Sequence, residues 1–338
     1  MEPILQLKNL SVSFDTQDGE VEAVRDVNLS LQKGEILALV GESGCGKTVL
    51  TQSVLKLLPK TSRIKNGQII VDGEDITNAK EKRMRNLRGS VMSMVFQDPM
   101  TTLNPTIPIG KQITEAVLKH HKVSKEEAKR RAVEMLSLVG IDDPVYRFSL
   151  QPHFFSGGMR QRCVLAIALA SNPDILFADE PTTALDVTVQ AKIIDLLLDI
   201  RDKTEISIVF ISHDLGVVAR IADRVAVMYA GKIVEIGTAE EIFYDPRHPY
   251  TWGLLAALPS HTKEGDTLRS IQGMPPVMLN PPPGDAFAVR NDYALAIDYE
   301  EMPPMFPITA THYAATWLLD ERAPQVKPPI LPKRGADI

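Results

Sequence analysis

Residues 41–48 read Gly-Glu-Ser-Gly-Cys-Gly-Lys-Thr, and no other segment constrains the fold of this chain as strongly. The segment has the spacing G-x-x-x-x-G-K-T, follows the apolar run 36–40 and precedes a helix-like stretch at 49–55. The glycines let the backbone wrap a polyphosphate, so that its N–H groups and the helix N-terminus face the negative charge. Strand, loop and helix in this order are the context that the spacing requires. The sequence therefore predicts a phosphate-binding loop.

The residues of this loop have separate predicted roles. Lys47 is expected to reach the β- and γ-phosphates of a nucleotide, and the Thr48 hydroxyl is expected to bind Mg²⁺. The residues expected to contact the nucleotide are Gly41, Ser43, Gly44, Gly46, Lys47 and Thr48.

Composition and charge limit the class of protein. The chain has 338 residues, enough for two or more domains with full cores. Its net charge of −6 argues against a nucleic-acid binder, which usually carries a basic surplus. Two cysteines are too few for a disulfide framework or a cysteine-built metal site. The sequence shows neither an apolar stretch of membrane-spanning length nor a signal-peptide pattern, so we expect any membrane link to come through a partner.

The order of apolar runs predicts an α/β fold. Strand-like runs occur at 4–7, 27–31 and 67–71, and a helical stretch follows at about 106–170. Residues 174–236 then alternate between strand-like and helix-like segments. Such alternation is typical of a mainly parallel sheet flanked by helices.

Beyond about Gly237 the composition changes. Half of the 24 prolines follow Gly273, among them the run 281–283. Proline has no backbone N–H to donate and is poorly tolerated inside helices and central strands. We therefore expect the C-terminal part to be an extended, loop-rich appendage that lies outside the sheet.

Two helix starts can be read from the sequence. Ser124 and Glu127 form a capping-box pattern, and Gly140 ends the helix that they begin. Ser156 is the N-cap candidate of a second helix, which follows the glycine turn and covers 159–171. The N–H groups behind Ser156 would make another anion site, although this pattern alone is also that of an ordinary helix start.

An apolar strand at 174–178 ends in two acids, Asp179 and Glu180. The carboxyl end of a parallel strand is where ligands bind in open α/β sheets. Asp179 is expected to help hold Mg²⁺, directly or through water. Glu180 is expected to polarise a water molecule for in-line attack on the γ-phosphate.

Together these motifs resemble those of the ATP-binding cassette (ABC) ATPases. Residues 156–161 are similar to the signature motif of that family, with Phe155 and Met159 in place of the common Leu and Gln. The signature supplies a helix N-terminus that contacts nucleotide, and the resemblance assigns this role to Ser156, Gly157 and Gly158.

Further positions extend the resemblance. Gln97 matches the family's glutamine that contacts Mg²⁺ and the attacking water, and His213 matches the histidine that contacts the γ-phosphate. Residues 183–186, which end in Asp186, match the loop that crosses the dimer interface. Phe14 stands where the family places an aromatic ring against adenine. The motifs occur in the family's order over residues 4 to about 240.

The resemblance also implies an architecture. It places a cassette at 1–240, with a mainly parallel sheet, an antiparallel β subdomain and a helical subdomain at about 100–170, followed by an extension at 241–338. Two cassettes of this family pair head to tail, with each ATP between one phosphate loop and the opposite signature. Ser156 and Gly158 would therefore contact the nucleotide of the partner. We expect an isolated chain to bind ATP but to hydrolyse it slowly.

Two regions narrow the resemblance to the D-type ATPase subunits of oligopeptide and dipeptide permeases. They are 96–105, which follows the glutamine-loop strand, and 243–258, which follows the cassette. The implied partners are a second homologous ATPase, two integral membrane permeases and an extracytoplasmic peptide-binding protein. The implied location is the cytoplasmic face of the cell membrane.

Three alternatives remain open at this stage. The substrate could be nickel or another small solute, because such importers share the same segments. A soluble ABC protein acting on DNA or ribosomes would usually carry a second cassette or a coiled-coil insertion, and the sequence shows neither. A nucleotide-binding but inactive subunit is disfavoured because Lys47, Gln97, Glu180 and His213 are all present.

One departure from the family pattern concerns the C-terminal part. Many relatives carry four cysteines there that bind an iron–sulfur cluster, and this sequence has oxygen-bearing side chains at the matching positions. Hard oxygen ligands do not hold such a cluster, so we expect none. Whether the carboxylates of Asp285 and Asp298 bind a hard cation instead stays open. The four positions are Asp285, Asn291, Asp298 and Thr316.

Overall fold

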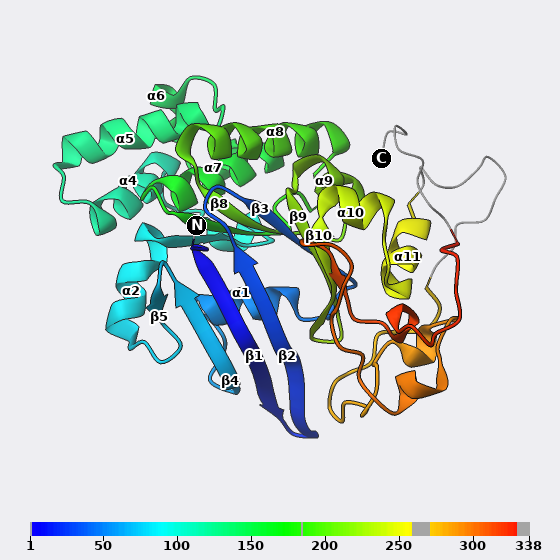
Figure 1. The fold of residues 1–338 in the computed structure, drawn as a ribbon. Coiled ribbons are helices and arrows are strands. Elements are labelled where there is room, and N and C mark those ends of the chain that lie inside the picture. Colours follow the sequence, from blue (N-terminus) through cyan, green and yellow to red (C-terminus); the bar gives the residue numbers. More distant parts are fainter. Residues whose placement is uncertain (1, 184, 259–270, 330–338) are drawn as a thin grey trace. The chain divides into compact units, whose positions relative to one another are not determined.

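The computed structural model describes residues 2–183, 185–258 and 271–329 (Figure 1). Their contacts divide into two compact units. The first unit contains residues 78–211 and two short N-terminal pieces. The second contains residues 5–31 and 36–77 and the chain from 212 onward.

The second unit contains a four-stranded antiparallel sheet in the order β2-β1-β4-β5. The strands are β1 (Leu5–Thr16), β2 (Gly19–Leu31), β4 (Ser62–Val71) and β5 (Glu74–Asp75). The first two are much longer than the predicted runs at 4–7 and 27–31. Register shifts around Leu10 interrupt the alternation of buried and exposed side chains, so the exposed Lys8 and Asn9 do not end the strand.

The same unit contains a second group of strands, in the order β11-β12-β10-β9-β3. β3 (Ile36–Val40) is parallel to β9 (Arg224–Tyr229), and β9 forms an antiparallel pair with β10 (Lys232–Thr238). Every residue of β3 is buried, as the predicted apolar run requires. The helices of this unit are α1 (Lys47–Val54), α9 (Leu215–Ile221), α10 (Ala239–Tyr244) and α11 (Pro249–Ala256).

The first unit combines parallel strands with the helical region. β6 (Met92–Val95), β7 (Ile175–Asp179) and β8 (Ser207–Ile211) pair in parallel, and all residues of β7 and β8 are buried. The predicted alternation of strands and helices over 174–236 is confirmed. The helices are α2 (Glu81–Ser90), α3 (Pro99–Thr102), α4 (Ile109–His120), α5 (Lys125–Leu138), α6 (Pro144–Arg147), α7 (Gly157–Leu169) and α8 (Val187–Thr204).

The helix start predicted at Ser124 is confirmed. The Ser124 hydroxyl accepts a hydrogen bond from the Glu127 N–H at 3.1 Å, and α5 follows. The Glu127 carboxylate lies 2.8 Å from Arg130 and 2.9 Å from Arg131. In Figure 1, α4, α5 and α7 form one cluster, with the short α6 beside them.

The expectation that the C-terminal part lies outside the sheet is wrong. β12 (Tyr313–Ala314) pairs antiparallel with β10, placing Ala314 opposite Glu235, and β11 (Phe306–Pro307) pairs with β12. The outer edge of β10 carries backbone groups that need partners, and β12 supplies them. Proline-rich composition ruled out long strands here but allowed two-residue ones. The described residues of this region also form short 3₁₀ helices at Ala288–Arg290, Ala296–Tyr299 and Trp317–Leu319.

A buried carboxylate fastens the C-terminal region to β10. Glu235 is fully buried and accepts hydrogen bonds from the backbone N–H groups of Arg247 at 2.6 Å and His248 at 3.1 Å. Its Oε1 also lies 2.8 Å from Nε2 of His312, which is fully buried as well. A single side chain thus joins β10 to the start of α11 and to the turn before β12.

No helix in the described parts of the chain is long and apolar enough to cross a membrane.

We predict that Glu235→Ala loosens the C-terminal region. The change leaves three buried groups without their acceptor, and each such group costs about 1–3 kcal/mol. We expect the apparent melting temperature to fall by roughly 5 °C or more, and proteases to cut the C-terminal region faster. Glu300→Ala removes an exposed glutamate from the same region and is the control. Equal behaviour of the two variants would contradict the anchoring role.

Candidate nucleotide-binding site

The phosphate loop of the second unit follows β3 and ends at α1. Its glycines have left-handed backbone angles, with φ of 144° at Gly41 and 106° at Gly46. A Cβ at Gly41 would lie 2.1 Å from the carbonyl oxygen of Met228, and one at Gly46 would lie 2.4 Å from that of Ala23. No side chain fits at either position, so the loop packs directly on β9 and β2. This tight curl is the shape that a polyphosphate requires.

Lys47 lies inside the curl. Its Nζ donates hydrogen bonds to the carbonyl oxygens of Gly41 at 2.7 Å and Glu42 at 2.9 Å, and the residue is only 6 % exposed. Ser43, Gly44 and Thr48 are exposed on the loop, where a ligand can reach them. The loop therefore places an ammonium group and accessible backbone together, and these residues fit a polyphosphate with its divalent cation.

Two more predicted residues lie in this unit. Phe14 lies on β1, opposite Val21 of β2 and Ser62 of β4, and is partly exposed. His213 lies between β8 and α9 and is exposed, and the next residue, Asp214, caps α9. The structure thus assigns the loop, the ring and the histidine to one unit.

The acidic residues belong to the first unit. Asp179 is the buried last residue of β7, and Glu180 follows it with φ of 47°, a strained value for a residue with a side chain. Gln97 donates from Nε2 to Glu180 Oε2 at 2.8 Å, and the Thr183 hydroxyl donates to the same oxygen at 2.9 Å. Two donors on one carboxylate oxygen hold the Glu180 side chain in a fixed orientation.

The signature region also lies in the first unit. The Ser156 hydroxyl caps α7 by accepting from the Met159 N–H at 3.3 Å, and Asp186 caps α8 by accepting from the Val189 N–H at 2.9 Å. A Cβ at Gly158 would lie 2.5 Å from Val189 Cγ1, so the start of α7 packs against the start of α8. The structure therefore brings the signature and the loop ending in Asp186 together. Ala184 of that loop lies outside the described residues.

Sequence reasoning missed two residues that contact the phosphate loop, Arg290 and Tyr250. Glu42 forms an ion pair with Arg290 at 2.6 Å, and the Glu42 N–H donates to the Tyr250 hydroxyl at 2.8 Å. Arg290 stands between two of the positions compared with the cysteines of relatives. No local pattern pairs this arginine with a residue 248 positions earlier in the chain.

Comparisons with known proteins agree with this geometry. The ABC transporter family model matches residues 24–183, and the model of the oligopeptide/dipeptide transporter C-terminal region matches 234–297. The chain is 58 % identical over 328 residues to the oligopeptide transport ATP-binding protein OppD of Bacillus subtilis, covering 96 % of this chain and 92 % of that protein. It is 55 % identical to the dipeptide transport ATP-binding protein DppD of Lactococcus lactis, covering 97 % and 94 %.

This chain belongs to the ABC transporter ATPases. A dimeric ATP-binding cassette solved in a post-hydrolysis state with ADP and Pi is similar in structure, with a TM-score of 0.63 and 25 % identity over 70 % of this chain and 98 % of the other. The predicted cassette fold is confirmed, and this ABC ATPase hydrolyses ATP as its family does.

The four positions of the missing thiols make local hydrogen bonds in this ABC ATPase. Asp285 accepts from the Phe287 N–H at 3.0 Å, and Asn291 accepts from the Tyr293 N–H at 3.0 Å. Asp298 accepts from the Leu295 N–H at 2.7 Å, and Thr316 accepts from the Leu318 N–H at 3.3 Å. Asp285, Asn291 and Thr316 accept from the residue two positions later, as in Asx and Ser/Thr turns. Asp298 instead accepts from Leu295, the residue just before its 3₁₀ helix. No group of three or more potential metal-ligating side chains was found among the described residues.

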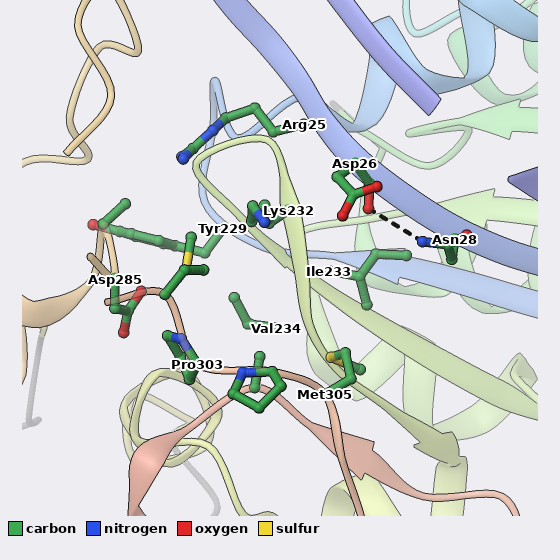
Figure 2. A pocket seen from close by; sticks show the side chains of 14 residues that line it. Arg25, Asp26, Asn28, Tyr229, Lys232, Ile233, Val234, Asp285, Pro303 and Met305 are labelled. Atoms are coloured by element: carbon green, nitrogen blue, oxygen red, sulfur yellow. Dashed lines mark hydrogen bonds between the residues drawn. The ribbon is translucent and has the colours of Figure 1, made fainter. Parts of the chain in front are cut away.

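Asp285 also lines a pocket of about 170 Å³ between the C-terminal region and the β9–β10 hairpin (Figure 2). Arg25, Tyr229 and Lys232 share this pocket. The pKa of Asp285 is raised to about 6, chiefly because the carboxyl is buried and to a lesser extent by the nearby Asp298. The hydrogen bond from the Phe287 N–H and the charges of Arg25 and Lys232 act in the opposite direction. The burial of this carboxyl therefore outweighs the attraction of its two basic neighbours.

We predict a pH-dependent stability linked to Asp285. Its pKa is higher in the folded protein than the ordinary value of 3.8, so the folded state binds this proton more tightly and stability falls as pH rises from about 4 to 6. Asp285→Asn keeps an oxygen acceptor for the Phe287 N–H and removes the charge. We expect it to stabilise the protein by about 1–3 kcal/mol at pH 8 and by almost nothing at pH 4.

Thermal unfolding across this pH range measures the effect. The control is Asp292→Asn, at an exposed neighbour, which should show no such trend. If Asp285→Asn were less stable than the parent at pH 8, the attraction of Arg25 and Lys232 would outweigh burial.

Proposed function

We propose that this ABC ATPase is the motor subunit of an importer for oligopeptides or dipeptides. Its similarity to peptide-transport ATP-binding proteins over 96 % or more of the chain carries the proposal. The second support is the C-terminal region, which matches the oligopeptide/dipeptide transporter model. The subunit works on the cytoplasmic face of the membrane, bound to its permeases. We assign the cassette to 1–240 and the peptide-importer extension to 241–338.

We infer the following roles for the residues of the site. Lys47 and the loop backbone bind the phosphates, with Phe14 against the base, while Thr48 and Asp179 hold Mg²⁺, which neutralises phosphate charge. Glu180 accepts a proton from the attacking water, and the hydrogen bonds from Gln97 and Thr183 fix its orientation. Gln97 also contacts Mg²⁺, and His213 contacts the γ-phosphate.

We propose that hydrolysis requires a second cassette. Ser156, Gly157 and Gly158 begin a helix whose N–H groups suit an anion, and they contact the nucleotide of the partner together with Asp186. The complex contains a second homologous ATPase, two membrane permeases and an extracytoplasmic peptide-binding protein. Nucleic acid has no part in this function.

The direct test is peptide uptake by cells that lack this subunit. We expect the parent chain to restore ATP-dependent uptake of a labelled peptide and Glu180→Gln to abolish it. The variant should still bind ATP, with hydrolysis in the full complex slowed roughly a hundredfold or more. Glu321→Gln, at an exposed position, should act like the parent. Restored uptake of labelled nickel without uptake of peptide would overturn the substrate assignment.

We further propose that the extension holds no iron–sulfur cluster. Carboxylate, amide and hydroxyl oxygens replace the thiolates, and all four side chains accept backbone hydrogen bonds. We expect no stoichiometric iron or acid-labile sulfide in protein expressed together with cluster-assembly machinery. A relative with four cysteines, prepared in parallel, shows that the assay detects a cluster. Iron and sulfide in the purified chain would refute this proposal.

A further inference from the structure

The C-terminal region forms hydrogen bonds with Glu42 of the phosphate loop. The guanidinium group of Arg290 donates to both carboxylate oxygens of Glu42, at 2.6 and 2.9 Å. The hydroxyl of Tyr250, from α11, accepts a hydrogen bond from the backbone N–H of Glu42 at 2.8 Å. Side chain and backbone of one loop residue are thus both held by the region that follows the cassette.

The guanidinium group of Arg290 is also held by hydrogen bonds to residues outside the loop. Its Nε donates to the carbonyl of Gln272 at 2.8 Å and its Nη2 to that of Gly273 at 3.1 Å. Its Nη1 lies 3.2 Å from the Tyr229 hydroxyl, and its side chain is only 4 % exposed. The bond to Glu42 is the main cause that raises the pKa of Arg290 above its ordinary value. This is a rigid, bidentate ion pair of the kind that gives geometric specificity.

Three packed rings support the two contacts. Tyr229, at the end of β9, lies 4.7 Å from Tyr250 and 5.2 Å from Phe287, measured between ring centroids. Phe287 lies 5.3 Å from Tyr250 and only three positions before Arg290. Because the same β9 strand also shapes the loop at Gly41, the rings join the loop, α11 and the C-terminal region into one packed body.

The charge of Glu42 explains why such a support matters. A carboxylate next to Gly41 and Ser43 stands beside the place where a polyphosphate binds, and like charges repel strongly where solvent is excluded. The bidentate pair neutralises that carboxylate before the nucleotide arrives. The Tyr250 contact also limits the freedom of a glycine-rich segment, so less conformational entropy is lost on binding.

We propose that Arg290 and Tyr250 are positioning residues that couple the C-terminal region to nucleotide binding. The proposal rests on the function given above, in which the loop binds ATP. Neutralised and held in shape by these two residues, the loop binds ATP tightly. By linkage, bound ATP in turn stabilises the docking of the C-terminal region by the same factor. The C-terminal region therefore helps to hold the phosphate loop in the form that binds ATP.

The first test measures binding of a fluorescent ATP analogue to the purified full-length chain. We expect Arg290→Ala to weaken binding about tenfold, because an unpaired Glu42 carboxylate then faces the phosphates. The affinity of Arg290→Lys should fall between those of the parent and Arg290→Ala, since lysine restores the charge without the bidentate geometry. Tyr250→Phe should weaken binding to a smaller extent. Arg322→Ala, at an exposed arginine of the same region, is the control and should bind like the parent.

A double variant separates charge from folding. If Arg290 acts by neutralising Glu42, Glu42→Gln with Arg290→Ala should bind the analogue more tightly than Arg290→Ala alone. A merely structural role for Arg290 predicts no such recovery. In the assembled transporter, Arg290→Ala should raise the KM for ATP more than it lowers kcat. Equal affinity of Arg290→Ala and parent, or no recovery in the double variant, would overturn the proposal.

Hydrogen exchange tests the reciprocal effect. The N–H groups of Asp285, Ala288 and Arg290 are hydrogen-bonded within the C-terminal region, so their exchange reports its docking. Saturating ATP should slow their exchange in the parent and in Arg322→Ala, and much less in Arg290→Ala. Unchanged exchange in the parent despite ATP binding would overturn the coupling. If parent and Arg322→Ala both failed to bind ATP, the proposed function would fail instead.

Discussion

Two backbone carbonyl groups determine the shape of the phosphate loop. The carbonyl oxygens of Met228 and Ala23 lie only 2.1 and 2.4 Å from where Cβ atoms of Gly41 and Gly46 would be. The loop can approach β9 and β2 so closely only because it has glycine at both points. A further hydrogen bond, from the Gly231 N–H to the Cys45 carbonyl at 2.9 Å, fastens the loop to the turn between β9 and β10.

The β9–β10 hairpin also holds the C-terminal region. It therefore contacts both the phosphate loop and the C-terminal region. β10 pairs with β12 and carries Glu235, whose carboxylate binds the start of α11 and His312. Within the region, the side chains of Asp285, Asn291, Asp298 and Thr316 accept backbone hydrogen bonds from residues two or three positions away. Local turns stabilise only their own segments. The docking of the region as a whole therefore depends on the strand pairing, the hydrogen bonds of Glu235, the Glu42–Arg290 ion pair and the packed aromatic rings.

Much of the local structure could be predicted from neighbouring residues. The strand at β3, the alternation over 174–236 and the caps at Ser124 and Ser156 were all readable, because each depends on groups within a few positions. The lengths of β1 and β2 were not readable, since bulges hide the alternation. The pairing of β12 with β10 also escaped prediction, because two-residue strands leave almost no pattern and depend on an edge elsewhere in the chain.

The sequence by itself determined the phosphate loop, the two acids at the end of β7 and the family to which the chain belongs. Glycine, lysine and capping residues act on neighbouring residues, so their spacing in the sequence is enough to predict these motifs. Only the tertiary structure decided that Glu42 is neutralised by Arg290, 248 positions later, and that Gln97 and Thr183 meet on one oxygen of Glu180. Such pairs depend on how distant segments of the chain pack together, and the local sequence around each residue does not predict that packing.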